Sequence, residues 1–337
     1  MRTIRTRIVA IVASGAFAWG VGSGTAGAGM MLKLGHDQPE RSTHHQAALK
    51  FRELIESRTK GDIQVKVFPA QLLGTGTQMV EQVQAGALET ALIPTAWIAP
   101  VAPSVQILDL PFLFPSRTVA YRVIDGPAGR EILRPLNKVS IEGVAFWEGG
   151  FKQFTGHFPI REPKDYEGHK IRTMPAPVII EQFKAFGATP VPIDFKELYS
   201  ALQQKVVDGQ ENPIATTVLM RFYEVQKYLT LSDHGYIAYV FLVHKPLLDR
   251  LPAATREALV QTAREAGRHQ RELIAESEKG HLETMRKAGL EITRLTPEQR
   301  AKFEQAARRV HDWYAQRQGS ELLDLVRKEI QAAAAAK

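Results

Sequence analysis

The sequence predicts an α/β fold of two lobes, and three observations lead to this prediction. Strand and helix patterns alternate over residues 31–93, which is typical of a parallel sheet with helical crossovers. Gly149-Gly150 marks a flexible joint, after which a second set of strand patterns begins, and the strand pattern at 236–244 returns to the first set. A helical pattern over 246–289 is unusually long for a small domain, and bracing two lobes is its natural use.

The first lobe consists of alternating strand and helix patterns that end at the glycine joint. Ala47, Phe51 and Ile55 recur at helical spacing, whereas Ile63 and Val65 alternate with polar residues as in a strand that faces a core. The predicted elements, in chain order, are a strand at 31–35, a helix at 41–59, a strand at 63–67, a helix through Met79 and Val83, a strand at 88–93, a helix at 116–133 that Gly126-Pro127 interrupts, and a strand at 139–147.

Residues 189–213 are the segment around which the second lobe is predicted to be organised. Asp194 is a good N-cap, and Phe195 begins a run of apolar residues at helical spacing. This helix follows an extended stretch at 190–193. Residues 210–213, QENP, are polar and end in proline, so they are not predicted to form an ordinary core strand. The polar side chains lie at one rim, where open α/β sheets bind ligands.

The remaining patterns complete the second lobe and set the predicted boundaries. Further strands are expected at 151–158, 170–174 and 228–232, and helices at 177–187 and 214–223. A capping box at Thr296 begins the first of two amphipathic helices that run to about residue 330. The predicted division is 29–150 plus 238–278 for lobe I, 151–237 plus 279–330 for lobe II, and an alanine-rich tail at 331–337.

The N-terminus has the pattern of a secretory signal peptide. Three arginines among the first seven residues precede the apolar residues 8–19, a run too short to span a membrane. Ala26-Gly27-Ala28 is a small-residue cleavage site, so we expect residues 1–28 to be removed and the mature protein to be periplasmic. A single membrane anchor or a disordered tail is the alternative interpretation. The G-x-G-x-x-G match at 22–27 follows no predicted strand, which argues against a nucleotide-binding loop.

Composition and missing motifs exclude several classes of protein. The 337 residues include no cysteine, which excludes disulfides, thiolate metal sites and a cysteine nucleophile. The net charge of +7 includes the three arginines of the signal, which leaves +4, and basic residues form no run, so nucleic-acid binding has little support. The sequence has neither a G-x-S-x-G nor an H-E-x-x-H motif, and His44-His45 is a poor metal pair because adjacent helical residues diverge. We expect no enzyme activity, no metal and no cofactor.

Several runs of residues resemble one family of transport proteins. The signal is specific because the runs are long and extend over roughly residues 31–325. The chain resembles the solute-binding proteins of TRAP transporters, the DctP-like periplasmic carriers of organic acids such as C4-dicarboxylates. The runs that carry the resemblance are EQVQAGALE at 81–89, LDLPFLF at 108–114, FKELYSALQ at 195–203, VDGQENP at 207–213 and FYEVQKYLT at 222–230.

The resemblance implies a fold, a function and partners. It implies a two-lobed, type II-like periplasmic binding protein with a mixed sheet in each lobe, hinge crossovers and a long bracing helix. The lobes would close over one small organic acid, and a small and a large membrane subunit would then carry the acid inward on an ion gradient. We expect a monomer. A periplasmic sensor that docks a receptor, and a periplasmic hydrolase or isomerase on the same fold, remain alternatives.

The same resemblance assigns roles to particular residues. Arg172, which by itself would be a solvated surface charge, matches the arginine that holds the ligand carboxylate with its planar fork of donors. Asn212 matches an asparagine that contacts the ligand, although Asn-Pro alone is typical of a turn. Phe195 matches an aromatic that packs on the ligand, although it also fits a core. The other candidate ligand contacts are His36 and Asp37 at a strand end, Trp97 after the third strand, Lys152 beside the joint, and Phe158.

One departure from the family pattern bears on the ligand. Phe158 stands where some members, including sialic-acid binders, carry a second arginine, and neither His157 nor Lys152 is an assured substitute. Two carboxylates buried against one arginine would leave a charge poorly paired, which is costly. The sequence therefore predicts a monocarboxylate with an apolar or aromatic body, with a C4-dicarboxylate or a sugar acid as the alternatives.

Overall fold

The computed structural model describes residues 29–277 and 280–335, so the predicted signal peptide, residues 1–28, lies outside the described residues. The strands are β1 (Met30–His36), β2 (Ile63–Phe68), β3 (Thr90–Pro94), β4 (Ile141–Gly156), β5 (Lys170–Thr173), β6 (Thr189–Pro192), β7 (Gly209–Pro213), β8 (Tyr228–His244) and β9 (Glu291–Arg294). The α-helices are α1 (Thr43–Arg58), α2 (Gly76–Ala85), α3 (Thr95–Ile98), α4 (Arg117–Asp125), α5 (Pro127–Leu133), α6 (Pro177–Ala185), α7 (Leu198–Gln203), α8 (Ile214–Leu219), α9 (Lys245–Arg250), α10 (Ala253–Ser277), α11 (His281–Lys287), α12 (Pro297–Gln318) and α13 (Glu321–Ala335). The 3₁₀ helices are η1 (Pro103–Asp109), η2 (Arg134–Val139), η3 (Pro163–Tyr166), η4 (Phe195–Glu197) and η5 (Phe222–Glu224).

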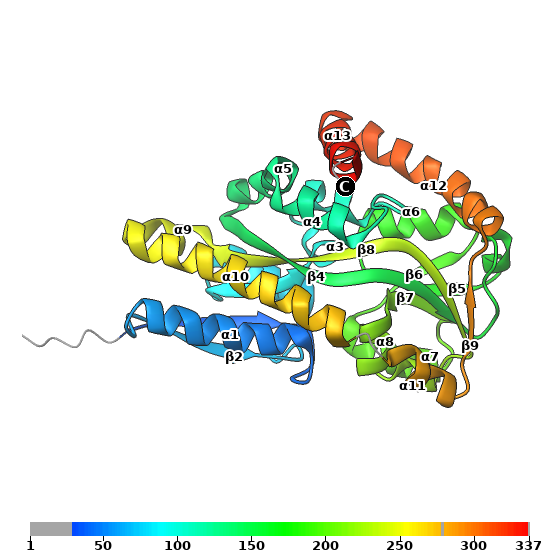
Figure 1. Cartoon of the computed structure of the whole chain (residues 1–337), viewed down its shortest axis with the longest axis horizontal. Coiled ribbons are helices and arrows are strands. Elements are labelled where there is room, and N and C mark those ends of the chain that lie inside the picture. Colours follow the sequence, from blue (N-terminus) through cyan, green and yellow to red (C-terminus); the bar gives the residue numbers. More distant parts are fainter. Residues whose placement is uncertain (1–28, 278–279, 336–337) are drawn as a thin grey trace, which may run out of the picture.

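The strands form one mixed sheet, which confirms the predicted α/β class. Its order is β2-β1-β3-β8-β4-β7-β5-β6, with β9 added beside β8. The prediction of separate strands on either side of the joint was wrong, because β4 and β8 each run unbroken through both halves and pair antiparallel along their length. Figure 1 shows these two long strands side by side across the molecule. The two lobes are therefore linked by continuous, hydrogen-bonded backbone.

The predicted joint lies inside this long strand pair, where the pairing is irregular. The β4–β8 register shifts between Glu148 and Gly150, as at a β-bulge. Gly150 has φ +112°, a conformation that favours glycine, and a Cβ on Gly149 would lie 2.6 Å from the Ile237 side chain. The glycines thus permit a bend in β4 at the predicted lobe boundary, and the boundaries themselves stay a prediction.

The single helix predicted over 246–289 was wrong, because this stretch is divided. Helix α9 ends at Arg250, and α10 begins after Pro252, whose missing N–H and fixed φ disfavour a continuous helix there. Gly280 has φ +84° and caps the start of α11. Helix α10 remains the long one, and it packs against both α1 and β4 (Figure 1). Helix α13 runs to Ala335, beyond the expected end near residue 330, because alanine is a strong helix former.

Helix α10 crosses β4 at close range, and Gly267 makes this possible. Trp147 of β4 is fully buried, and its Nε1 donates to the Ala263 carbonyl of α10 at 3.0 Å. A Cβ on Gly267 would lie 2.6 Å from Trp147 Cδ1 and 3.1 Å from the Phe146 carbonyl oxygen. Neither neighbour can move freely, because one is a buried ring and the other is sheet backbone.

We expect Gly267→Ala to lower the free energy of unfolding by about 1–3 kcal/mol, the usual cost of overpacking a core. A decrease in stability would be informative, because alanine in place of glycine ordinarily stabilises a helix interior by up to about 1 kcal/mol. Urea unfolding measures the change. Glu272→Ala, on a side chain of α10 that is 79% exposed, is the matched control and should stay within about 0.5 kcal/mol. A Gly267→Ala protein as stable as the parent would contradict the close packing.

Apolar side chains from both lobes form one continuous buried core. A smaller cluster, made of Leu229, Leu231, Met285 and Leu290, lies where β8 meets β9 and α11. Across the described residues, no helix combines the length and the apolarity needed to cross a membrane.

Candidate ligand-binding site

Arg172 of β5 is a buried arginine with an unused donor. Its Nε donates to the Ile193 carbonyl at 2.9 Å, and the residue is only 2% exposed. Its Nη2 is also buried and has no hydrogen-bond partner among residues 29–277 and 280–335. A buried donor without a partner is costly, and such groups are rare in native proteins. Arg172 therefore keeps one buried donor that no described residue uses.

The electrostatic surroundings of Arg172 come from both lobes. Burial lowers its pKa to about 10, and the carboxylates of Asp194, Glu211 and Asp37 oppose that shift. The guanidinium thus stays protonated at neutral pH. On the predicted division, Asp37 falls in lobe I, and Asp194 and Glu211 fall in lobe II, so carboxylates assigned to both lobes act on the guanidinium.

Lobe I presents a group of buried polar residues after β1. Asp37 accepts hydrogen bonds from the Tyr239 hydroxyl at 3.1 and 3.3 Å, and Gln38 Nε2 donates to the same hydroxyl at 2.7 Å. Burial raises the pKa of Asp37 to about 7, in spite of these hydrogen bonds. His36 contacts His45 at 3.0 Å between ring nitrogens, and burial together with the neighbouring histidines lowers the pKa of His36 to about 3. His36 is consequently neutral at physiological pH.

Strand β7 contains the QENP residues, and the prediction that they would not form a core strand was wrong. All five residues of β7 are buried, and the strand lies between β4 and β5. Asn212 donates to Gln210 Oε1, and Gln210 Nε2 donates to Thr155 Oγ1 at 2.7 Å. These partners satisfy polar groups that would otherwise be costly to bury. Asn212 occupies the end of the strand, beside the start of α8.

Lys152 is buried, but its charge is already neutralised. Its Nζ forms an ion pair with Glu211 Oε1 at 2.5 Å, and both side chains are almost completely buried. Glu211 Oε2 also accepts from Gln182 Nε2 at 2.8 Å and pairs with His234 Nε2 at 2.6 Å. Burial alone would raise the pKa of Glu211, yet Lys152 and His234 outweigh burial and lower it to about 2. Lys152 therefore lies beside the joint as part of an internal charge network.

A second buried carboxyl, Asp109 of η1, lies close to this network. Thr95 Oγ1 donates to its Oδ2 at 2.9 Å. Burial raises the pKa of Asp109 to about 7, and Lys152 opposes the shift. On the predicted division, Asp109 falls in lobe I and Lys152 in lobe II, so the two groups influence each other across the predicted boundary.

The three aromatic candidates lie in different places. Trp97 is buried in α3 and packs against Gly76 at the start of α2. Phe195 follows Asp194, whose carboxylate caps η4, and its ring meets Phe222 edge to face at 6.1 Å. These contacts anchor both rings within their own lobes.

Phe158 packs against other aromatic side chains near the start of β5. Its ring stacks on His169 with the ring centroids 3.6 Å apart, and it also contacts Tyr166. His169 precedes the start of β5, whereas Arg172 is near the end of that strand. The role of Phe158 in ligand binding stays a prediction.

Two contacts between the lobes were missed from the sequence. Gln71 Nε2 donates to Asp194 Oδ2 at 3.3 Å, and an Arg41 guanidinium nitrogen donates to the Leu219 carbonyl. Ala70 and Gln71 both have positive φ, at 51° and 58°, which is unusual for residues with a side chain. Nothing in the local sequence predicts these contacts, because propensities give no signal for a left-handed turn at Ala70 and Gln71.

This arrangement suits the binding of an anion. One buried guanidinium offers an unused donor, and polar residues of both lobes surround it. Within the described residues, no group of three or more His, Asp or Glu side chains could hold a metal ion. The chemistry available at the site is thus charge-assisted hydrogen bonding to an oxyanion such as a carboxylate.

Comparison with known proteins agrees with this chemistry. The family described as bacterial extracellular solute-binding protein, family 7 (DctP), matches residues 34–318. The 2,3-diketo-L-gulonate-binding periplasmic protein YiaO of Escherichia coli is 34% identical over 89% of this chain and 92% of its own length. The C4-dicarboxylate-binding periplasmic protein DctP of Rhodobacter capsulatus is 34% identical over 88% of this chain and 90% of its own length.

A solved structure extends the likeness to the whole fold. A TRAP periplasmic solute-binding protein from Desulfovibrio salexigens, crystallised with bound orotic acid, superposes with a TM-score of 0.87 at 35% identity. The superposition covers 90% of this chain and 99% of that protein. On the evidence of the matched family and this shared fold, the chain belongs to family 7 of the bacterial extracellular solute-binding proteins, the periplasmic solute-binding proteins of TRAP transporters.

Proposed function

We propose that the protein captures a small organic acid with one carboxylate, which Arg172 holds while the two lobes close around it. The observation that carries the proposal is the buried, unpartnered Nη2 of Arg172. A ligand carboxylate would accept from this nitrogen and so offset the cost of burying an incompletely bonded guanidinium. Contacts such as Gln71–Asp194 would form only when the lobes meet, which couples closure to binding.

The charges around Arg172 support a ligand with a single carboxylate. Lys152, the other buried cation near the joint, is neutralised by Glu211 and so offers no free charge to a second carboxylate. The Asp194 carboxylate, which acts on Arg172 from the same lobe, would repel such a group. The ligands named for YiaO and for the Desulfovibrio protein each carry one carboxylate.

We further propose that the body of the ligand is apolar or aromatic. Phe195 of lobe II and Trp97 of lobe I are the rings that would pack on it, and orotic acid, bound by the Desulfovibrio protein, has a planar ring. A dicarboxylate is the competing proposal, because the Rhodobacter relative is named for that class. A sugar acid is the other, since Gln38, Asn212 and Asp37 could bond hydroxyl groups.

A thermal-shift screen with the purified protein tests the proposed ligand class. Orotate, aromatic monocarboxylates and 2-oxo acids are compared with galactonate and succinate at equal ionic strength. A ligand at 100 times its dissociation constant adds about 2.7 kcal/mol of stability, so we expect a monocarboxylate to raise Tm by several degrees. Stabilisation by succinate alone would reject the single-carboxylate proposal. Recovery of the acid unchanged after incubation is the expected result for a carrier, whereas turnover would identify an enzyme.

Capture in the periplasm would precede delivery to the small and large membrane subunits of a TRAP transporter. The family to which the chain belongs works with such components, and the relatives from Escherichia and Rhodobacter are named as periplasmic. We propose that the mature protein begins near Gly29 after removal of the signal peptide and acts as a monomer.

A further inference from the structure

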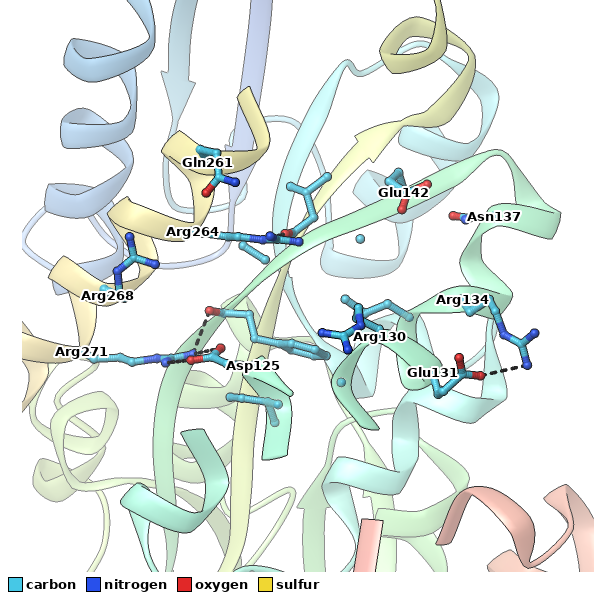
Figure 2. Close-up of a pocket in the computed structure, with 17 residues that line it drawn as sticks. Asp125, Arg130, Glu131, Arg134, Asn137, Glu142, Gln261, Arg264, Arg268 and Arg271 are labelled. Carbon is cyan, nitrogen blue, oxygen red and sulfur yellow. Dashed lines mark hydrogen bonds and ion pairs between the residues drawn. The ribbon is translucent and has the colours of Figure 1, made fainter. Parts of the chain in front are cut away.

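A second polar cavity lies apart from Arg172 and shares no residue with the site around it. It is open to solvent on one side and has a volume of about 600 Å³, between α10 and the α4–α5–η2 segment and against the first half of β4. Figure 2 shows charged side chains from both walls around this space. Its charged lining consists of Asp125, Arg130, Glu131, Arg134, Glu142, Arg264, Arg268 and Arg271.

Two of the five arginines are neutralised by acids of the same cavity. Arg271 forms a bidentate pair with Asp125, at 2.5 and 2.9 Å, and also donates to the Phe146 carbonyl at 3.2 Å. Arg134 pairs with Glu131 at 2.9 Å. The remaining acid, Glu142, lies toward Asn137 in Figure 2, and burial raises its pKa. These acids therefore leave three guanidinium groups without a counter-charge.

The three uncompensated arginines stand on opposite walls. Arg264 and Arg268 come from α10, and Arg130 comes from α5 (Figure 2). Arg264 uses Nε to donate to the Val144 carbonyl at 3.2 Å, which leaves its two terminal nitrogens for other acceptors. The side chains of Arg130 and Arg268 are exposed, and neither forms a hydrogen bond or ion pair with another described residue.

We propose that this cavity binds a multivalent oxyanion of the phosphate class. Like charges on facing walls repel one another, and an anion between them would replace repulsion with attraction. The planar fork of each guanidinium matches two oxygens of a phosphate group. The volume lies within the range of small-ligand sites. Three guanidinium groups without a counter-charge favour a ligand with more negative charge than a single carboxylate. The proposed oxyanion therefore differs from the organic acid proposed to bind Arg172.

The cavity lies beside the packing contact between α10 and β4, the strand that contains Gly149 and Gly150. Arg264 and Arg271 donate to carbonyl oxygens of β4 while their helix forms one wall of the cavity. An anion that bridges Arg268 and Arg130 would link α10 to α5 and raise the thermal stability of the protein.

Inorganic pyrophosphate is the probe that tests the proposal. Isothermal titration and thermal shift are measured on the purified protein at constant ionic strength, for the parent and for Arg130→Gln/Arg268→Gln. Hydrogen bonds to charged groups contribute about 1.5–3 kcal/mol each, so we expect the double variant to weaken binding at least about tenfold. Arg52→Gln/Arg308→Gln removes two exposed charges elsewhere and should leave binding unchanged. Arg172→Gln should also retain it, which places the probe outside the organic-acid site.

A second experiment, with vesicles of phosphatidylglycerol in phosphatidylcholine, distinguishes a lipid headgroup from a free phosphate compound as the natural ligand. Vesicle binding that pyrophosphate competes away, and that the Arg130/Arg268 double variant loses, identifies a lipid headgroup. Pyrophosphate binding without vesicle binding identifies a free phosphate compound. The proposal is overturned if pyrophosphate gives no saturable binding, or if both double variants bind it as the parent does.

Discussion

Replacing Arg172 with methionine is expected to lower the affinity for the organic acid at least about 100-fold. The carboxylate would lose two charge-assisted hydrogen bonds, each contributing about 1.5–3 kcal/mol, and every 1.4 kcal/mol corresponds to a factor of ten. The ligand-free protein should keep its Tm nearly unchanged. Methionine removes a buried nitrogen that has no partner, and this gain offsets the lost hydrogen bond from Nε to the Ile193 carbonyl.

Titration calorimetry with the acid that gives the largest thermal shift measures the effect. Arg172→Lys keeps the charge but loses the fork of donors, so we expect it to recover only part of the affinity. Arg161→Met, on an arginine of the same lobe whose side chain is 57% exposed, is the matched control and should bind as the parent does. Undiminished binding by Arg172→Met would show that the carboxylate is held elsewhere.

The sequence predicted the fold class and much of the order of elements, because apolar periodicity reports local structure directly. The extended stretch at 190–193 corresponds to β6, and the box at Thr296 caps α12 with reciprocal hydrogen bonds to Gln299. The division of the C-terminal helical stretch was missed, although Pro252 and Gly280 were both visible in the sequence. Their effect was hidden because the apolar stripe continues past them.

What the sequence could not predict depends on partners that are distant along the chain. Lys152 and Glu211 are 59 residues apart, and Gln71 and Asp194 are 123 apart. QENP resembles a turn because polar residues can be buried only with hydrogen-bond partners, and here the partners come from β4, β8 and α6, which are distant along the chain. For the same reason, nothing local distinguishes Arg172 from a surface arginine, and only the family resemblance singled it out.

Replacing Glu211 with glutamine is expected to lower the free energy of unfolding by about 3–5 kcal/mol. The substitution leaves the Lys152 ammonium buried without its counter-charge, and breaking a buried ion pair from one side usually costs this much. Glutamine would also disturb the hydrogen bonds that the carboxylate accepts from Gln182 and His234. Urea unfolding of the ligand-free protein at pH 7 measures the change. Glu272→Gln, on an exposed carboxylate, should alter stability by less than about 0.5 kcal/mol.

The pH dependence follows from the pKa of Glu211. Its pKa is about 2 in the folded protein against an ordinary value of 4.5, so the carboxylate contributes stability above about pH 4.5. That contribution is lost as the pH falls toward 2. The difference in unfolding free energy between the parent and Glu211→Gln should therefore shrink over this interval. A difference that stays constant with pH would contradict the assignment of the low pKa to Glu211.

A double-mutant cycle separates the ion pair from the packing of its two side chains. Lys152→Met alone leaves Glu211 buried with His234 and Gln182, whereas Lys152→Met/Glu211→Gln removes both charges together. We expect the double variant to be less destabilised than the sum of the two single variants, because neither charge is then left unpaired. If the effects simply add, the two side chains do not interact as the structure describes. If the Lys152→Met protein is folded but binds the organic acid more weakly, Lys152 contacts both Glu211 and the ligand.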